Sequence, residues 1–503
     1  MSNSHSTEAD TINDAPQTPL AEIRAQRIEK GQRFRDAERN PYGGRADNIT
    51  STADARQQYA NAAEDCTVSV KLAGRLMSKR DMGKSCFCDV RDQSGRMQVY
   101  AQKNRIGEEE FELFKSLDIG DIVEVSGDIF TTRTEEVTLR AESFRLLSKS
   151  LRPLPEKWHG LTDVQQRYRQ RYLDMISNPE VRDRFLARTQ IVREIRRFLD
   201  ERAYIEVETP MLQPIPGGAA ARPFETFYHA LDCPMYMRIA PELYLKRLLV
   251  GGFERVYEIN RNFRNEGLSR NHNPEFTMLE LYQAYGDCRS MMETVESLIV
   301  TVAERVVGSL TLQVGEHEIN LNPPWRRVPY ADLIAEHMGA DWNELPTTEK
   351  AQKARDLQLS ISKEMTDAEI THEIYEKVIE HTLIQPTFVT RLPVELVPLA
   401  KTCEDDPSVV DVFELEINGS EISPGYSELN DPLEQRRRFE QQRGSKTEAD
   451  EQGALDEDFL AALEYGMPPA GGAGVGIDRL LMLMLNAASI RDVILFPQLR
   501  PTE

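Results

Sequence analysis

Residues 263–280 read FRNEGLSRNHNPEFTMLE, and this stretch decides how the rest of the chain is interpreted. It opens with an arginine and a glutamate on a short polar loop, continues with a His-Asn pair and an aromatic residue, and ends in a carboxylate on an apolar strand. An arginine binds phosphate through two parallel hydrogen bonds, an aromatic ring stacks on a base, and a buried carboxylate pairs with a cation. The stretch therefore predicts one pocket for a nucleotide and a small cationic group.

A second arginine, Arg479, is predicted to serve the same pocket from far downstream. It lies in the run GVGIDR (474–479), where a glycine-rich strand is followed by a helix. The glycines of residues 471–476 lack the Gly-Lys-Ser/Thr ending of a phosphate-binding loop. We therefore expect them to permit a close approach between the backbone and a ligand.

The composition is that of an ordinary soluble globular protein with more than one domain. The chain has 503 residues, of which 40% are apolar and 29% charged. No apolar run reaches the roughly 20 residues that span a membrane, and the polar N-terminus lacks the features of a secretory signal. The six cysteines include no Cys-x-x-Cys pair, so we expect reduced thiols, a cytoplasmic location and no structural zinc.

The net charge of −22 argues against nucleic acid binding by the surface as a whole. Local patches decide contact, however, and residues 22–45 hold seven basic side chains against four acidic ones. This segment is interpreted either as a solvated helix or as an arm that contacts phosphates.

The periodicity divides the chain into regions of different structure. Residues 66–150 alternate with a period of two and predict five short strands, with a helix between the third and fourth, which is typical of a small closed barrel of the OB type. Further on, helices are expected at 181–203 and 242–250 and apolar strands at 277–285 and 472–476, a mixed α+β pattern. The predicted divisions are a disordered tail (1–18), a helical extension (19–65), an OB-fold domain (66–150), a linker (151–178) and a catalytic domain (179–503).

Six runs in a fixed order resemble the class II lysyl-tRNA synthetases, and the resemblance covers the chain beyond residue 20. The runs are ETPML (208–212), IPGGA (215–219), RIAPELYLKR (238–247), the opening stretch, EISPGYSELND (421–431) and GVGIDR (474–479). The resemblance implies an α+β fold, with an antiparallel-sheet catalytic domain and helices preceded by an N-terminal OB-fold barrel. It also implies a homodimer without a membrane contact.

The implied activity is that of a lysine–tRNA ligase, which uses ATP to form lysyl-adenylate and transfers lysine to the 3′-end of tRNA(Lys). Activation brings two anions together, the lysine carboxylate and the α-phosphate, so catalysis needs positioning and charge neutralisation. Arg264 and Arg479 are the implied catalytic residues. Glu414 and Glu421, on a predicted pair of strands, would hold Mg²⁺ by the same resemblance, since Mg²⁺ prefers carboxylate oxygens.

The resemblance also assigns binding residues for each substrate. For ATP they are Arg264, Glu266, His272, Asn273, Phe276 and Arg479. For lysine they are Gly218, Glu242, Glu280, Tyr282, Tyr426 and Glu428. Of these, Glu280, Glu428 and Tyr282 would take the lysine side chain, and Glu242 with the backbone at Gly218 would take the α-amino end. For the tRNA anticodon they are Arg75, Phe87, Gln98 and Glu136, although Phe87 taken alone is interpreted as a core residue.

Two positions depart from the family's pattern. Pro424 replaces the usual asparagine, and Asn271 replaces the arginine that usually precedes the His-Asn pair. Two alternatives therefore stay open. One is an aspartyl- or asparaginyl-tRNA synthetase of the same subclass. The other is a paralogue that does not charge tRNA, either a protein-lysylating enzyme or a regulatory protein.

Overall fold

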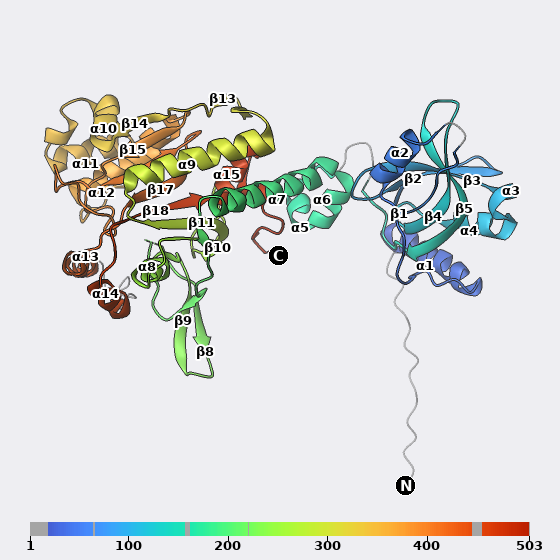
Figure 1. The fold of residues 1–503 in the computed structure, drawn as a ribbon, viewed down its shortest axis with the longest axis horizontal. Coiled ribbons are helices and arrows are strands. Elements are labelled where there is room, and N and C mark those ends of the chain that lie inside the picture. Colours follow the sequence, from blue (N-terminus) through green and yellow to red (C-terminus); the bar gives the residue numbers. More distant parts are fainter. Residues whose placement is uncertain (1–18, 64–65, 156–160, 220, 445–454, 502–503) are drawn as a thin grey trace, which may run out of the picture. The chain divides into compact units, whose positions relative to one another are not determined.

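The computed structural model describes residues 19–63, 66–155, 161–219, 221–444 and 455–501 (Figure 1). The chain forms two compact units, residues 1–160 and residues 161–503. The predicted disordered tail lies outside the described residues. Much of the segment predicted to be a linker is helical and belongs to the second unit, as α5 (Val164–Arg169) and α6 (Arg171–Ser177).

The first unit contains a closed five-stranded barrel, which confirms the predicted OB-type fold. The strands follow one another around the barrel in the order β1-β2-β3-β5-β4. Cys86 and Cys88 are buried in the barrel, whereas Phe87 between them lies on the outer side. The elements are α2 (Thr52–Ala60), β1 (Ser69–Asp81), β2 (Ser85–Arg91), β3 (Arg96–Gln102), α3 (Lys103–Ile106), α4 (Glu108–Ser116), β4 (Ile122–Thr131) and β5 (Val137–Ser148).

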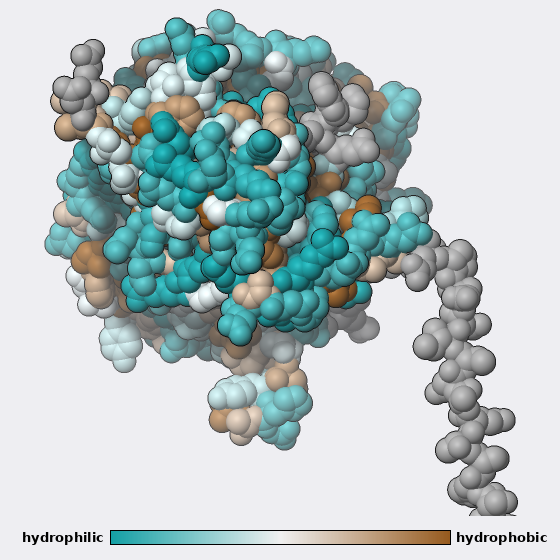
Figure 2. Space-filling view, turned by 90° about the vertical axis from the view of Figure 1, so that its right-hand side faces the viewer, coloured by the Kyte–Doolittle hydropathy of each residue, from teal (hydrophilic) through white to brown (hydrophobic). Residues whose placement is uncertain are grey.

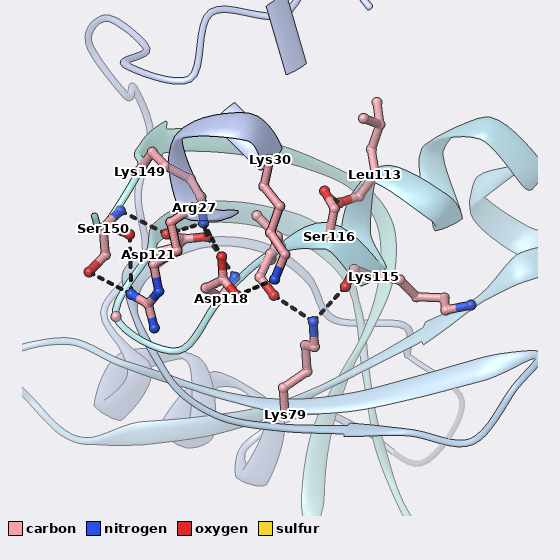
Figure 3. A network of polar contacts seen from close by, with 12 residues as sticks. Arg27, Lys30, Lys79, Leu113, Lys115, Ser116, Asp118, Asp121, Lys149 and Ser150 are labelled. Carbon is pink, nitrogen blue, oxygen red and sulfur yellow. Dashed lines mark hydrogen bonds and ion pairs between the residues drawn. The ribbon is translucent and has the colours of Figure 1, made fainter. Parts of the chain in front are cut away.

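Helix α1 (Pro19–Asp36) is fixed to the barrel through its basic side chains. Arg27 donates hydrogen bonds to the carbonyl oxygens of Ser150 (3.1 Å) and Arg152 (2.9 Å), and Lys30 pairs with Asp118 at 2.6 Å. Figure 3 shows these contacts converging on the loop before β4 and the end of β5. Two basic groups of the segment 22–45 therefore hold the helix in place, which favours a structural role for them over phosphate contact.

The second unit is built on an eight-stranded, mainly antiparallel sheet with the order β14-β15-β16-β17-β18-β11-β10-β6. Parallel pairing occurs between β14 and β15 and between β10 and β6. The strands are β6 (Ile205–Glu206), β10 (Arg255–Phe263), β11 (Glu275–Ala284), β14 (Arg326–Pro329), β15 (Thr387–Thr390), β16 (Val412–Glu416), β17 (Glu421–Ser427) and β18 (Ala470–Gly476).

Helices α7 (Pro179–Asp200), α9 (Cys288–Val302) and α15 (Ile477–Met484) cover one face of this sheet (Figure 1). Leu279 and Leu281 of β11 and Ala473 and Val475 of β18 point into that helical core. Because side chains alternate along a strand, the residues between them point to the opposite face. That face carries Glu280 on β11, with α8 (Glu242–Val250) and α14 (Glu457–Glu464) packed around its edge.

The remaining elements form smaller layers around the sheet. Helices α10, α11 and α12 pack on β14–β16 around a separate core that includes Trp342 and Tyr375. The elements are β7 (Leu212–Gln213), β8 (Glu225–Tyr228), β9 (Cys233–Met237), η1 (Ala303–Val307), β12 (Thr311–Val314), β13 (His317–Asn320), α10 (Tyr330–Met338), η2 (Trp342–Glu344), α11 (Thr347–Asp356), α12 (Asp367–Ile374), η3 (Tyr375–Ile379), η4 (Glu380–Thr382), α13 (Pro432–Gly444) and α16 (Ile490–Val493).

The face of the molecule seen in Figure 2 is predominantly hydrophilic, with hydrophobic residues scattered over it. This agrees with a chain in which charged residues make up 29% of the sequence. Among the described helices, none combines the length and the apolar character that a membrane span requires.

Candidate active site

The six residues assigned to ATP by resemblance line a single pocket in the second unit. The pocket has a volume of about 160 Å³ and lies between the loop that joins β10 to β11, the end of β17 and the start of α15. Besides the six, its wall includes Glu421, Pro424 and Asn271. The residues assigned to ATP are Arg264, Glu266, His272, Asn273, Phe276 and Arg479. Their roles remain predictions, but the fold brings them together from segments more than 200 residues apart.

Arg264 is positioned at the start of the β10–β11 loop. Its backbone N–H donates to the carbonyl of Pro274 at 2.8 Å, which ties the two ends of the loop together. The guanidinium carbon lies 5.2 Å from the centre of the Phe276 ring. Its buried Nε has no hydrogen-bond partner among the described residues. An arginine that stacks on an aromatic ring and has an unpaired Nε–H is suited to bind an anion through two hydrogen bonds.

Arg479 reaches the same pocket from the first turn of α15. One of its guanidinium nitrogens donates to the carbonyl of Glu421 at 2.7 Å, and the other lies 2.9 Å from Nε2 of His272. Burial and the neighbouring Arg479 charge lower the pKa of His272. The imidazole is therefore neutral at pH 7 and can accept a hydrogen bond from Arg479.

Asn273 is held by the backbone on both sides of its amide. Its Nδ2 donates to the carbonyl of Glu275 at 2.6 Å, and its Oδ1 accepts from the N–H of Gln498 at 3.2 Å. These bonds give Asn273 a structural function in shaping the pocket, beyond the ligand contact that the resemblance implies.

The second part of the site is a buried cluster of carboxylates next to the nucleotide pocket. Glu242, Glu280 and Glu428 are 5%, 6% and 1% exposed, so their charges are almost removed from water. The Tyr426 hydroxyl donates to Glu242 at 2.6 Å, and the Tyr282 hydroxyl donates to Glu280 at 3.1 Å. The structure thus brings together five residues assigned to lysine from α8, β11 and the end of β17.

Lys246 lies inside this cluster, although the sequence analysis does not single it out. Its side chain is fully buried, and its ammonium nitrogen lies 2.7 Å from Glu242 and 2.5 Å from Glu428. Oε1 of Glu428 has no hydrogen-bond partner among the described residues. The available signal was the spacing of four residues from Glu242 within a largely apolar helix, which places both side chains on one helical face.

The pKa values of the cluster reflect its excess of negative charge. Burial, reinforced by Glu242, raises the pKa of Glu280 to about 8. Burial also raises the pKa of Glu428 to about 8, although Lys246 acts in the opposite direction. Burial would lower the pKa of Lys246, but the two carboxylates outweigh that effect and raise it. Carboxyl groups that retain protons near neutral pH are expected where a cation is missing.

Glycines of β18 leave room for these side chains. In the sheet register Gly472 lies between Tyr282 and Tyr426, and Gly474 lies opposite Glu280. A Cβ atom at position 472 would approach within 2.1 Å of Glu428 Oε1 and 2.5 Å of the Tyr282 ring. The glycine-rich strand therefore has no side chains at these positions and leaves space for the cluster. No other residue fits at position 472 without displacing an assigned lysine ligand.

Gly218, the sixth residue assigned to lysine, borders the cluster at Glu242. It has φ +85°, and a Cβ atom there would lie 3.1 Å from the Cβ of Glu242 and 3.2 Å from that of Ala240. Glycine is favoured at this position because other residues rarely adopt positive φ.

The two predicted metal ligands lie on neighbouring strands. Glu414 is on β16, and Glu421 opens β17 and lines the nucleotide pocket. Burial, reinforced by Glu421, raises the pKa of Glu414 to about 8. Mg²⁺ commonly binds one or two protein carboxylates and completes its shell with water and phosphates. The pair fits such an ion, although no group of three or more potential ligands is gathered among the described residues.

The residues assigned to the anticodon lie on the barrel of the first unit. In the strand register Phe87 is opposite Tyr100, and Gln98 is opposite Thr138. Phe87, Gln98 and Tyr100 alternate with buried residues and lie on the outer side. The rings of Phe87 and Tyr100 stack at 4.5 Å between centroids. Gln98 already accepts a hydrogen bond from Thr138 at 3.0 Å.

The other two anticodon candidates have partners of their own within the barrel. Arg75 donates to the carbonyl of Gly120 at 2.8 Å, and Glu136 lies 3.4 Å from Arg56. Tyr100 and Phe130, whose ring centres are 6.1 Å apart, extend the aromatic row and were not selected from the sequence. The available signal was that each of them alternates with buried residues along its own strand.

Comparison with known proteins identifies a matching family for each of the two units. The family of class II tRNA synthetases (D, K and N) matches residues 163–500, and the OB-fold nucleic acid binding domain matches residues 70–147. The chain is 53% identical over 489 residues to a lysine–tRNA ligase of Pelotomaculum thermopropionicum, covering 96% of each chain. It is 48% identical over 480 residues to the lysine–tRNA ligase of Bacillus subtilis, covering 94% of this chain and 96% of that protein. This chain belongs to the class II tRNA synthetases of the D, K and N group.

Proposed function

We propose that this protein is a lysine–tRNA ligase, which activates L-lysine with ATP and transfers it to the 3′-end of tRNA(Lys). The observation that carries the proposal is the buried cluster of Glu242, Glu280 and Glu428, which holds more negative than positive charge beside an arginine-bearing pocket. The relatives at 48–53% identity are lysine–tRNA ligases, which agrees with it.

The order of residues along β11 supports an arrangement in which ATP and lysine bind side by side along the strand. Phe276, Met278, Glu280 and Tyr282 alternate onto one face, so a base beside Phe276 and an ammonium at Glu280 lie about 13 Å apart along the strand. The carboxylate of lysine and the α-phosphate of ATP fall between them, near Arg264. Both groups are anions, and Arg264 would offset their repulsion while it orients them.

Arg479 would neutralise charge at the far end of the triphosphate. Its hold on the Glu421 carbonyl and its contact with His272 fix the guanidinium before a ligand arrives, so little reorganisation is needed. No side-chain nucleophile is required, because the attacking atom is an oxygen of the lysine carboxylate itself.

Glu414 and Glu421 are proposed to hold Mg²⁺ with the phosphates. The ion would supply positive charge that favours departure of pyrophosphate. The family resemblance further supports a homodimer and a cytoplasmic location.

The outer face of the barrel is proposed to bind the anticodon of tRNA(Lys). The stacked pair of Phe87 and Tyr100 offers rings for unpaired bases, and Gln98, Arg75 and Glu136 offer polar groups on the same barrel.

Pyrophosphate exchange with a panel of amino acids tests the proposal. Purified protein with ATP should exchange pyrophosphate in the presence of lysine, and not with aspartate or asparagine. Exchange with aspartate or asparagine would identify the enzyme as a different member of the subclass, whereas exchange without tRNA charging would identify a paralogue that modifies another acceptor.

A further inference from the structure

Lys246 connects two carboxylates that come from different parts of the fold. Glu242 opens α8, while Glu428 follows β17 and is fixed by its backbone N–H, which donates to the carbonyl of Ala470 at 2.8 Å. The Lys246 ammonium lies 2.7 Å from the first and 2.5 Å from the second. A single fully buried side chain thereby sets the distance between these two groups.

The resemblance assigns these same two carboxylates to opposite ends of the lysine substrate. Glu242 would take the α-ammonium, and Glu428 with Glu280 would take the ε-ammonium. The bridge therefore joins the two ends of the substrate pocket. We expect the separation that it fixes to select the length of the amino acid that fits.

The charge of the cluster points in the same direction. Among the described residues within hydrogen-bond reach, the cluster has three carboxyl groups and one ammonium, which would carry a net charge of −2 with every group ionised. The nearby Arg238 is already paired with Glu258 at 2.7 Å. Lysine carries two ammonium groups, so with the substrate bound the three carboxylates would face three cations. Without Lys246 the cluster would have three carboxylates for two cations.

Resting on the proposed function, we propose that Lys246 is a positioning residue that determines the specificity of the lysine pocket. It holds Glu242 and Glu428 at a fixed separation, so that the pocket accepts two ammonium groups at the spacing found in lysine. It does not touch the reacting atoms.

The test compares Lys246→Met, which removes the charge, with Lys246→Arg, which keeps the charge but changes its geometry. Lys350→Met is the matched control, because Lys350 is also buried and ion-paired, to Asp367 at 2.8 Å, outside the site. Pyrophosphate exchange is measured with lysine and with ornithine, which is one methylene shorter, from pH 6.5 to 9. A thermal shift induced by ATP reports an intact fold.

For Lys246→Met we expect kcat/KM for lysine to fall roughly 100-fold at pH 7, chiefly through KM, as when a buried charge loses its partner. The loss should shrink as pH rises, because the pKa of Glu428, already raised by burial, loses its main lowering influence. The groups that face Glu428 are Glu242 and Lys246 on α8, Glu280 and Tyr282 on β11, and Tyr426 on β17. Lys246→Arg should retain the wild-type pH profile and discriminate lysine from ornithine less well.

A folded Lys246→Met enzyme with the wild-type pH profile and the wild-type preference for lysine over ornithine would overturn the inference. If Lys246→Met shows no ATP-induced shift, Lys246→Arg decides, and unchanged discrimination there would overturn the inference equally. A wild-type enzyme without lysine-dependent exchange would instead refute the proposed function, which keeps the two failures distinct.

Discussion

Two buried clusters of charge, one in each unit, differ in their balance. In the first unit Lys30 and Lys149 face Asp118 and Asp121, two cations against two anions, with contacts of 2.6–2.8 Å (Figure 3). In the second unit Glu242, Glu280 and Glu428 lie in one cluster, and among the described residues Lys246 is the cation that pairs with it, through Glu242 and Glu428. The centre of each cluster is buried, yet only the second has more carboxyl groups than cations among the described residues.

The pKa values follow this difference. Burial raises the pKa of Asp118, but hydrogen bonds from Lys149 and Lys30 outweigh it and leave the pKa below its usual value. The pKa values of Glu280 and Glu428 instead rise to about 8. A balanced cluster joins elements of the fold, whereas an unbalanced one is ready for a cationic ligand. We therefore propose a structural role for the first cluster and a binding role for the second.

The largest expected effect comes from reducing the excess charge. Glu428→Gln should lower kcat/KM for lysine by about 1,000-fold, because a buried ammonium loses a charged partner. Pyrophosphate exchange measures it, and the ATP-induced thermal shift should be unchanged. Wild-type lysine affinity in this variant would contradict the assignment of the cluster to binding.

Removing a cation from the balanced cluster should affect stability alone. Lys149→Met leaves Asp118 and Asp121 without their shared buried partner and should lower the free energy of unfolding of the first unit by about 3–5 kcal/mol. Chemical denaturation measures this change. Lysine-dependent exchange should persist at the wild-type rate, and its loss would show that the two clusters do not differ in function.

The aromatic row of the barrel should affect the tRNA step and leave activation intact. Phe87→Ala removes a ring that stacks on Tyr100 and is expected to weaken tRNA binding by about 1–3 kcal/mol, the usual contribution of base stacking. The assays are tRNA charging and pyrophosphate exchange on the same preparation. Equal losses in both would argue for a core role of Phe87.

A smaller effect is expected from pH. Free Glu280 and Glu428 hold protons below their pKa of about 8, and an ammonium binds only the ionised form. Lysine affinity should therefore rise between pH 6 and 8, up to about tenfold per pH unit for each proton released. It should fall again above about pH 10, where lysine loses its ε-charge. Calorimetry in two buffers of different ionisation enthalpy measures the released protons, and a flat profile would contradict the raised pKa values.

The smallest change is expected at the rim of the balanced cluster. Lys30 has a third of its side chain exposed and pairs with Asp118 through the single contact at 2.6 Å. Lys30→Ala should cost about 1 kcal/mol or less in denaturation, as for other ion pairs in contact with water. A loss as large as that of Lys149→Met would contradict the distinction between the rim and the centre.

The sequence predicted local elements better than the contacts between them. The helix expected at 242–250 has these bounds in the structure, because its apolar residues recur with helical spacing. The strand expected at 277–285 spans Glu275–Ala284. It begins two residues earlier than expected, where the polar loop ends. The barrel was predicted from period-two alternation and confirmed.

Pairings across distant segments could not be predicted from residue patterns. The bridge from Lys246 to Glu428 depends on how α8 meets the end of β17, and the clearance above Gly472 depends on sheet register. The inward-facing Arg27 of α1 depends on contacts with the end of β5 and the segment after it. Local charge alone left that segment open between two interpretations.

The most direct test of the unbalanced cluster compares binding of L-lysine with that of L-norleucine, which has the same chain without the ε-ammonium. Calorimetry on the wild-type enzyme with ATP gives both affinities and the proton release. We expect lysine to bind at least about 1,000-fold more tightly and to release protons at pH 7. Similar affinities for the two amino acids would contradict the claim that the excess carboxylate charge exists to bind a cation.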